Sequence, residues 1–106
     1  MGTIAHDSIT AAASERDRER IIAFRNGLPD RWRTLLVGPV PPLVNGYEFW
    51  AFLPDGSKEW WSTSDEGDRY RTEFADLLDE IRADFAYVRF GGDFGIEHGA
   101  AVIRES

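Results

Sequence analysis

The sequence predicts a single α+β domain, with a four-stranded, mostly antiparallel sheet and one long amphipathic helix on one face. Three observations support this fold. An aromatic segment, residues 47–63, reads as a β-hairpin; an apolar stripe over residues 70–81 has helical spacing; and two further strand-like segments flank a glycine-rich loop. At 106 residues and 42% hydrophobic content, the chain has the size and composition of one folded domain. We expect residues 14–106 to form it.

Residues 1–13 show no sustained hydrophobic period, so they are expected to be a flexible N-terminal tail. Two short helices should follow. The first, residues 14–27, has Ser14 as a candidate N-cap and Gly27 as a stop signal. The second follows Pro29 and places Trp32, Leu35 and Leu36 on one side. Three prolines among residues 38–42 then favour an extended connector.

The aromatic hairpin is closed by Pro54-Asp55-Gly56, a combination typical of a tight turn. Alternation puts Tyr47 and Phe49 on one face with Ala51, Leu53 and Trp61, and puts Trp50, Phe52 and Trp60 on the other. Both faces are therefore apolar. The long helix could cover one face and the N-terminal helices the other, or Trp50 and Trp60 could stay exposed as an interface anchor. A platform for single-stranded nucleic acid is the third alternative, and it is disfavoured because Lys58 is the only base on either strand.

The long helix has the clearest pattern in the chain. Its apolar positions, Tyr70, Phe74, Leu77, Leu78 and Ile81, form one stripe, and Thr63 or Ser64 supplies the cap. Its opposite side carries Glu73, Asp76, Asp79 and Glu80. These acids are either an ordinary solvated face or a docking surface for a basic partner. Strands are then expected over residues 85–90 and from about residue 97 to residue 104.

Composition excludes several function classes. The chain contains no cysteine, which rules out disulfides and thiolate chemistry. A net charge of −7 argues against nucleic-acid binding. We expect a cytoplasmic protein that does not contact membranes, because neither a secretory signal nor an apolar run of membrane-spanning length is visible. Eleven arginines against one lysine are typical of a GC-rich genome, such as that of an actinobacterium or one of its phages.

The loop 91–99 is the best candidate for a ligand site. Asp93, Glu97 and His98 could act as an acid–base pair or hold a metal, although a simple hairpin loop explains the glycines equally well. Neither a dinucleotide fingerprint nor a P-loop is present, and no cofactor is expected.

These patterns favour a small acidic, non-enzymatic protein-interaction module, of the inhibitor, immunity-type or phage accessory kind. Its expected contact residues are Trp50, Phe52, Trp60, Glu73, Asp76, Asp79 and Glu80, and its expected partner is another protein with basic character. Two alternatives stay open. One is a small enzyme or ligand-binding domain that uses loop 91–99. The other is a structural homodimer that buries its second aromatic face against a symmetry mate.

Overall fold

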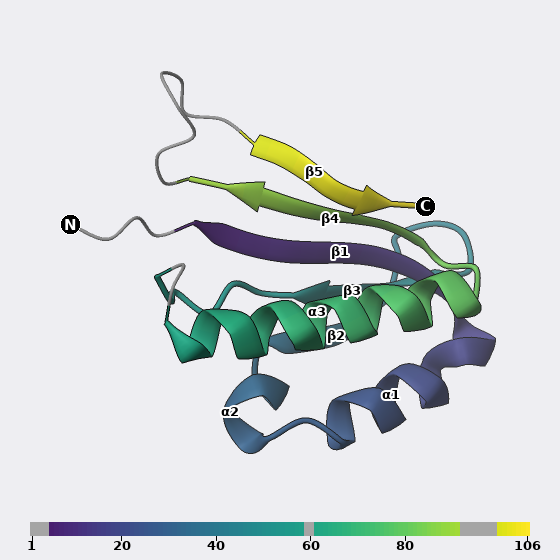
Figure 1. Ribbon diagram of the computed structural model, residues 1–106. Helices are drawn as coiled ribbons and strands as arrows, with labels where there is room; N and C mark the ends of the chain where they lie inside the picture. Colours follow the sequence, from purple (N-terminus) through teal and green to yellow (C-terminus); the bar gives the residue numbers. More distant parts are fainter. Residues whose placement is uncertain (1–4, 59–60, 92–99) are drawn as a thin grey trace.

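The computed structural model describes residues 5–58, 61–91 and 100–106 (Figure 1). Along the chain, the elements are β1 (His6–Ser14), the 3-10 helix η1 (Glu15–Asp17), α1 (Arg18–Asn26), α2 (Asp30–Arg33), β2 (Leu36–Val40), β3 (Tyr47–Phe52), α3 (Ser62–Glu80), β4 (Asp84–Phe90) and β5 (Ala100–Glu105). The fold is α+β with an antiparallel sheet and a long helix, as predicted. The sheet has five strands rather than four, in the order β2-β3-β1-β4-β5.

Two of these strands, β1 and β2, were not expected, and, among the described residues, the second arm of the predicted hairpin is not a strand of the sheet. Strand β1 replaces most of the expected N-terminal tail. It lies at the centre of the sheet and pairs antiparallel with both β3 and β4. Its buried residues alternate with less buried ones, and Ile9, Ala11 and Ala13 are buried toward the helices. The tail prediction for residues 1–13 is therefore wrong over residues 6–13. Alanine and serine gave little hydrophobic signal, yet small side chains suit a central strand because they let α3 approach closely.

The aromatic hairpin also differs from the expectation. Strand β3 ends at Phe52, and Asp55 then accepts hydrogen bonds from the backbone N–H and the hydroxyl of Ser57, at 2.7 and 2.6 Å. Helix α3 already begins at Ser62, with Trp61 at its N-cap, so the helix occupies residues that the hairpin would have used. Two serines, a threonine and an aspartate at this point are strong signals for a helix start.

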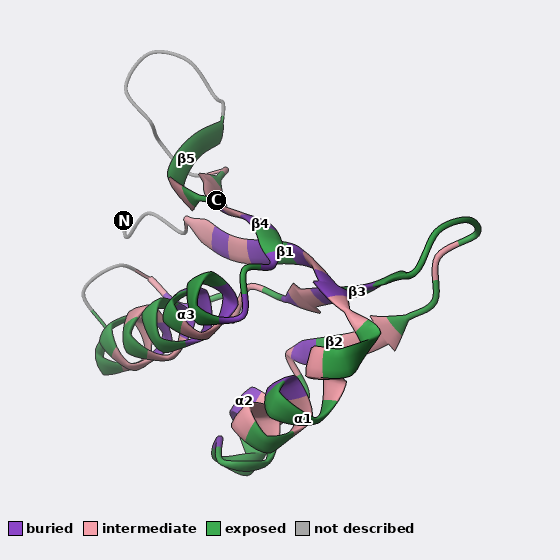
Figure 2. Ribbon diagram, turned by 90° about the vertical axis from the view of Figure 1, so that its right-hand side faces the viewer, coloured by how far each residue is buried: buried purple, intermediate pink, exposed green. Residues whose placement is uncertain are grey.

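All the helices pack on one face of the sheet (Figure 2). The rings of Phe24 in α1 and Phe74 in α3 stack at 5.4 Å, and Trp32 in α2 meets Tyr70 in α3 edge-on at 5.5 Å. One core therefore holds α1, α2, α3 and the sheet together. The alternative in which the N-terminal helices cover the second face is therefore wrong.

The predicted stripe of α3 is confirmed. Phe74 and Leu78 are fully buried, Ile81 is nearly so, and Tyr70 and Leu77 pack at the edge of the core. The predicted connector of residues 38–42 begins within the edge strand β2, and an edge position tolerates Pro39. Gly38 has φ of +129°, and a Cβ there would lie 2.8 Å from the carbonyl oxygen of Phe49, so only glycine fits.

Candidate interaction surface

The second face of the sheet carries no helix among the described residues (Figure 2). We call it the open face. Register defines its members, because directly paired residues of an antiparallel sheet point to the same side. They are Val37 and Val40 of β2, Tyr47, Phe49 and Ala51 of β3, His6, Ser8, Thr10, Ala12 and Ser14 of β1, Asp84, Ala86, Val88 and Phe90 of β4, and Ala100, Val102 and Glu105 of β5.

Large apolar side chains on this face are exposed to solvent. Tyr47 and Phe49 are 52% and 42% exposed, and Val40 and Val102 are exposed to a similar degree. The members given above include no lysine or arginine, and the acids are Asp84 and Glu105, both near one end of the sheet. A contiguous apolar surface of this kind, with charge kept to its margin, is typical of a protein-contact site.

The open face has relief. Ser8, Thr10 and Ala12 run along the central strand, so the middle of the face is low. A depression of about 360 Å³ lies there, lined by Thr10, Ala11, Ala12, Phe49, Asp84, Phe85, Ala86 and Ser106. Phe49 borders this depression from the β3 side, so an aromatic side chain adjoins the hollow.

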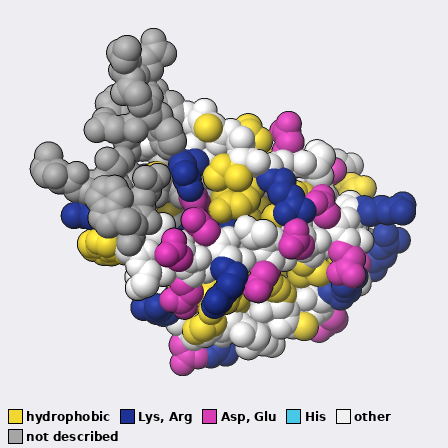
Figure 3. Space-filling view, viewed as in Figure 1, with side chains coloured by type: hydrophobic (Ala, Val, Ile, Leu, Met, Phe, Trp, Pro, Cys, Tyr) yellow, Lys and Arg dark blue, Asp and Glu magenta, His cyan; other side chains and the backbone are white. Residues whose placement is uncertain are grey.

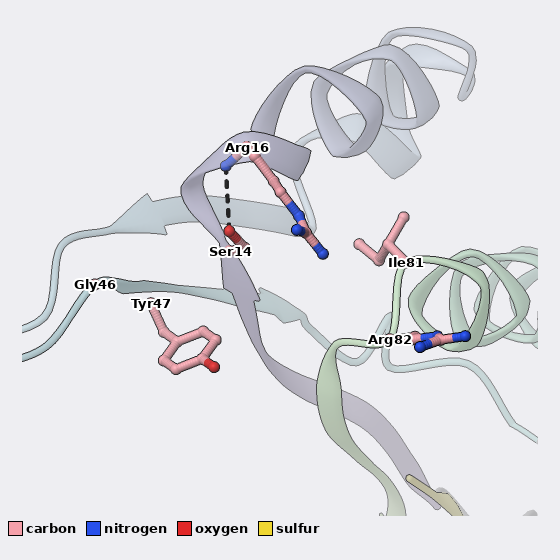
Figure 4. Close-up of a pocket in the computed structure, with 6 residues that line it drawn as sticks. All are labelled: Ser14, Arg16, Gly46, Tyr47, Ile81 and Arg82. Atoms are coloured by element: carbon pink, nitrogen blue, oxygen red, sulfur yellow. Dashed lines mark hydrogen bonds between the residues drawn. The ribbon is translucent and has the colours of Figure 1, made fainter.

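A second cavity, of about 290 Å³, lies where the open face meets the turn after α3 (Figure 4). Ser14, Arg16, Gly46, Tyr47, Ile81 and Arg82 line it. The hydroxyl of Ser14 accepts a hydrogen bond from the backbone N–H of Arg16 at 3.4 Å, which begins η1. Two arginines, Arg16 after β1 and Arg82 just before β4, therefore line this cavity together with Tyr47.

Two of the predicted contact residues are not available for binding. Trp50 and Phe52 are 1% and 0% exposed, on the helix-covered side of β3. The guanidinium of Arg25 lies 5.6 Å from the Trp50 ring, and Phe52 meets Phe74 edge-on at 5.9 Å. Their assignment to an interface is therefore wrong. The sequence places aromatic residues on both faces of β3, and only the position of the helices decides which face is buried.

The acidic side of α3 is exposed but partly neutralised by arginines of the same chain. Arg104 of β5 donates to Asp76 at 2.7 Å and also to Asp79, and Arg20 of α1 donates to Glu80 at 2.5 Å. Glu73 is exposed on the same side. Figure 3 shows acidic and basic side chains interspersed over the helix layer. This arrangement weakens the case for α3 as a docking surface for a basic partner.

A polar cluster that the sequence did not reveal lies beneath the first half of α3. Asp7 of β1 is buried and accepts two hydrogen bonds from Arg89 of β4, at 2.7 and 3.0 Å. Burial, together with the neighbouring Asp7 carboxylate, raises the pKa of Asp68 in α3. Burial is also the main cause that raises the pKa of Tyr87 to about 12. The carboxyl groups of Asp7 and Asp68 therefore lie close together beside Arg89.

A buried ion pair fixes the start of α3. Arg71 is 2% exposed, donates to Asp55 at 3.2 Å, and lies against the rings of Trp32 and Phe52. The hydrogen bonds from Ser57 and the charge of Arg71 lower the pKa of Asp55, despite the opposing effect of its burial. Gly67 makes room for this pair, because a Cβ there would lie 2.6 Å from atoms of both Arg71 and Asp55. These charges attach α3 to the turn after β3.

The remaining predicted site residues, Trp60 and the loop residues Asp93, Glu97 and His98, lie outside the described residues. Within residues 5–58, 61–91 and 100–106, no group of three or more histidine, aspartate or glutamate side chains is placed to hold a metal ion. None of the helices in these ranges has the length and apolar character needed to cross a membrane. The chain matches no protein-family model, no curated protein and no solved structure.

Proposed function

We propose that this chain is a non-enzymatic protein-interaction module and that the open face of its sheet is the contact surface. The observation that carries the proposal is the one-sided placement of the helices, which leaves Tyr47, Phe49 and their apolar neighbours uncovered. Covering this surface with another protein removes apolar area from water at about 25 cal/mol per Å².

The open face has the dimensions of a protein interface. Five strands about 4.8 Å apart and about six residues long, at about 3.3 Å each, span roughly 24 by 20 Å. The flat area of this face is therefore roughly 480 Å², and the projecting side chains make its accessible area larger. In a standard complex each partner buries roughly 800 Å². A small inhibitor, immunity-type or phage accessory protein would act through such a surface.

Binding assays on paired variants test this proposal. Phe49→Glu places a charge at the centre of the open face. Trp61→Glu makes the same chemical change on the helix side, at a residue of similar exposure, 48% against 42%. We expect wild type and Trp61→Glu to retain a protein partner in affinity capture and in reconstitution with purified components, and Phe49→Glu to lose it while keeping its circular dichroism spectrum. If no protein contact of the chain depends on Phe49, the proposal is wrong.

A further inference from the structure

We infer that the protein covering the open face is a second copy of this chain. The inference rests on the proposed function and names its partner. In this dimer, two sheets pack face to face about a two-fold axis that runs along β1, so that β3 of each copy lies over β4 of the other.

The relief of the open face is self-complementary under this symmetry. In a two-fold dimer, residue i of one copy contacts residue j of the other, and residue j of the first copy contacts residue i of the second. A surface that packs against its own copy therefore needs a projection on one side of the axis and a hollow on the other side. The ring of Phe49 stands on the β3 side of β1. The depression begins at Phe49 and extends across Thr10 and Ala12 of β1 to Asp84, Ala86 and Ser106 on the β4 side. Rotation about β1 therefore seats each Phe49 over the hollow of the other copy.

The residues on the axis allow the two sheets to approach. Ser8, Thr10, Ala12 and Ser14 are small, so the middle of β1 carries no bulky side chain on this face, and His6 lies at one end of the strand beside Phe90. Aligned sheets in a sandwich pack about 10 Å apart, rotated by about 30°. The central depression is the part of the face that Phe49 of the partner copy would fill.

The charges on the face fit a copy of the same chain better than they fit a basic partner. Its members include only two acids, Asp84 and Glu105, and both lie on one side of β1. The rotation places them over the β3 side of the other copy, away from their own symmetry mates.

Pairing through the edges of the sheet is the competing mode of self-association, and the edges are poorly suited to it. Edge strand β2 contains Pro39 and a register shift between Val37 and Val40. The pairing of β4 with edge strand β5 has its own shift between Tyr87 and Val88. Proline and bulges are features that block the addition of a further strand. The face, and not an edge, is left for contact between copies.

Sedimentation velocity and site-directed crosslinking test the dimer. The chain has no cysteine, so a single introduced one is an unambiguous anchor. Thr10→Cys lies on the axis, and a bismaleimide with a spacer of about 10 Å, the distance between packed sheets, should join two copies. Glu73→Cys on the exposed side of α3 is the control and should stay uncrosslinked.

We expect the wild-type mass to rise from monomer to dimer between about 1 and about 200 μM, a range that covers standard-sized contacts of modest affinity. Phe49→Glu should weaken dimerisation at least about 30-fold, the loss typical of a hot-spot side chain. Ala86→Glu places a longer, charged side chain at the β4 border of the hollow and should weaken dimerisation in the same way. This second variant keeps the test decisive if Phe49→Glu does not fold. Trp61→Glu should dimerise like wild type.

The outcomes separate the two proposals. A wild-type chain that stays monomeric over this range, yet binds a different protein through Phe49, overturns the dimer and leaves the proposed function standing. A monomer without any Phe49-dependent partner overturns both. A dimer that tolerates Phe49→Glu and Ala86→Glu, and in which Thr10→Cys does not crosslink, overturns both the open face as the contact between copies and the geometry proposed for it.

Discussion

Phe49 and Trp50 are neighbours in the sequence, yet their rings have opposite environments. Trp50 is enclosed between β3 and α1, whereas Phe49 faces solvent on the open face. Trp50→Ala should therefore lower the free energy of unfolding by about 3–5 kcal/mol, through lost burial and the cavity left behind. Phe49→Ala should lower it by less than about 1 kcal/mol. Urea denaturation at submicromolar concentration, below the range proposed for dimerisation, measures both. Equal losses would contradict the assignment of the two faces.

Asp68 should make stability depend on pH in an unusual direction. The pKa of Asp68 in the folded chain is raised above the ordinary value of 3.8. At a pH between 3.8 and the folded-state pKa, the folded chain therefore holds a proton that the unfolded chain has released. Its contribution to the free energy of unfolding therefore falls as pH rises through that window. Asn resembles the protonated acid, so Asp68→Asn should stabilise the chain at pH 7 by about 0.2–1 kcal/mol, the scale of partly exposed charge interactions.

Denaturation of both proteins from pH 3 to pH 8 checks this expectation. The difference between wild type and variant should shrink toward zero below pH 3.8, where the wild-type side chain is also neutral. The difference between the two proteins reports the contribution of Asp68 alone to the pH dependence of stability. Asp55, whose pKa is lowered, contributes in the opposite direction, but it does so equally in both proteins. A variant less stable than wild type at pH 7 would mean that the Asp68 carboxylate makes a contact the fold needs.

Among the elements, β1 has the largest consequence for the fold. It joins β3 on one side to β4 on the other, so its loss would divide the sheet into two fragments and remove Ile9, Ala11 and Ala13 from the core. Deletion of residues 1–13 should therefore abolish cooperative unfolding, seen as loss of the thermal transition and of dispersed amide resonances. Deletion of residues 1–4 leaves β1 entire and is the control. A folded chain lacking residues 1–13 would contradict the placement of β1.

The sequence predicts some of these elements better than others, for physical reasons. Helix α3 and strand β4 follow from periodicity, because bulky apolar residues mark their buried sides. Strand β1 is marked mainly by alanine, serine and threonine, which the close approach of α3 requires but which leave hardly any hydrophobic pattern. The residues after Gly56 contain tryptophans, which favour a strand, next to serine, threonine and aspartate, which favour the start of a helix. In the structure this segment begins helix α3, and Arg71 of that helix pairs with Asp55 in the preceding turn.

At the scale of the whole molecule, the sequence predicts an apolar surface in the right region but on the wrong side of β3. Which side stays open depends on where α1 and α2 pack, and their contacts with α3 involve residues such as Phe24 and Trp32 that have no local preference for either face. The acidic side of α3 is predicted correctly as exposed. Its neutralisation by Arg104 and Arg20 depends on long-range geometry that no local pattern encodes.

The net charge of the molecule predicts how its association responds to salt. Two copies each carry −7, so long-range repulsion opposes the dimer at low ionic strength. Raising NaCl from about 20 to about 300 mM shortens the Debye length to well below the size of the molecule, and the dimerisation constant should tighten. Sedimentation equilibrium measures this. If added salt instead weakens dimerisation, the two contacting surfaces attract each other through opposite charges.

The position of β1 has a consequence for how the chain acquires its structure during translation. β1 is synthesised before the other four strands, yet Ile9 pairs with Phe52 and with Tyr87, which leave the ribosome much later. Until then, both hydrogen-bonding edges of this strand have no partner in the sheet. Folding dominated by such distant pairings is slow, since long segments must be ordered before any contact is made. Until β4 has emerged, the unpaired edge of β1 in a nascent chain of this design is therefore a site for aggregation.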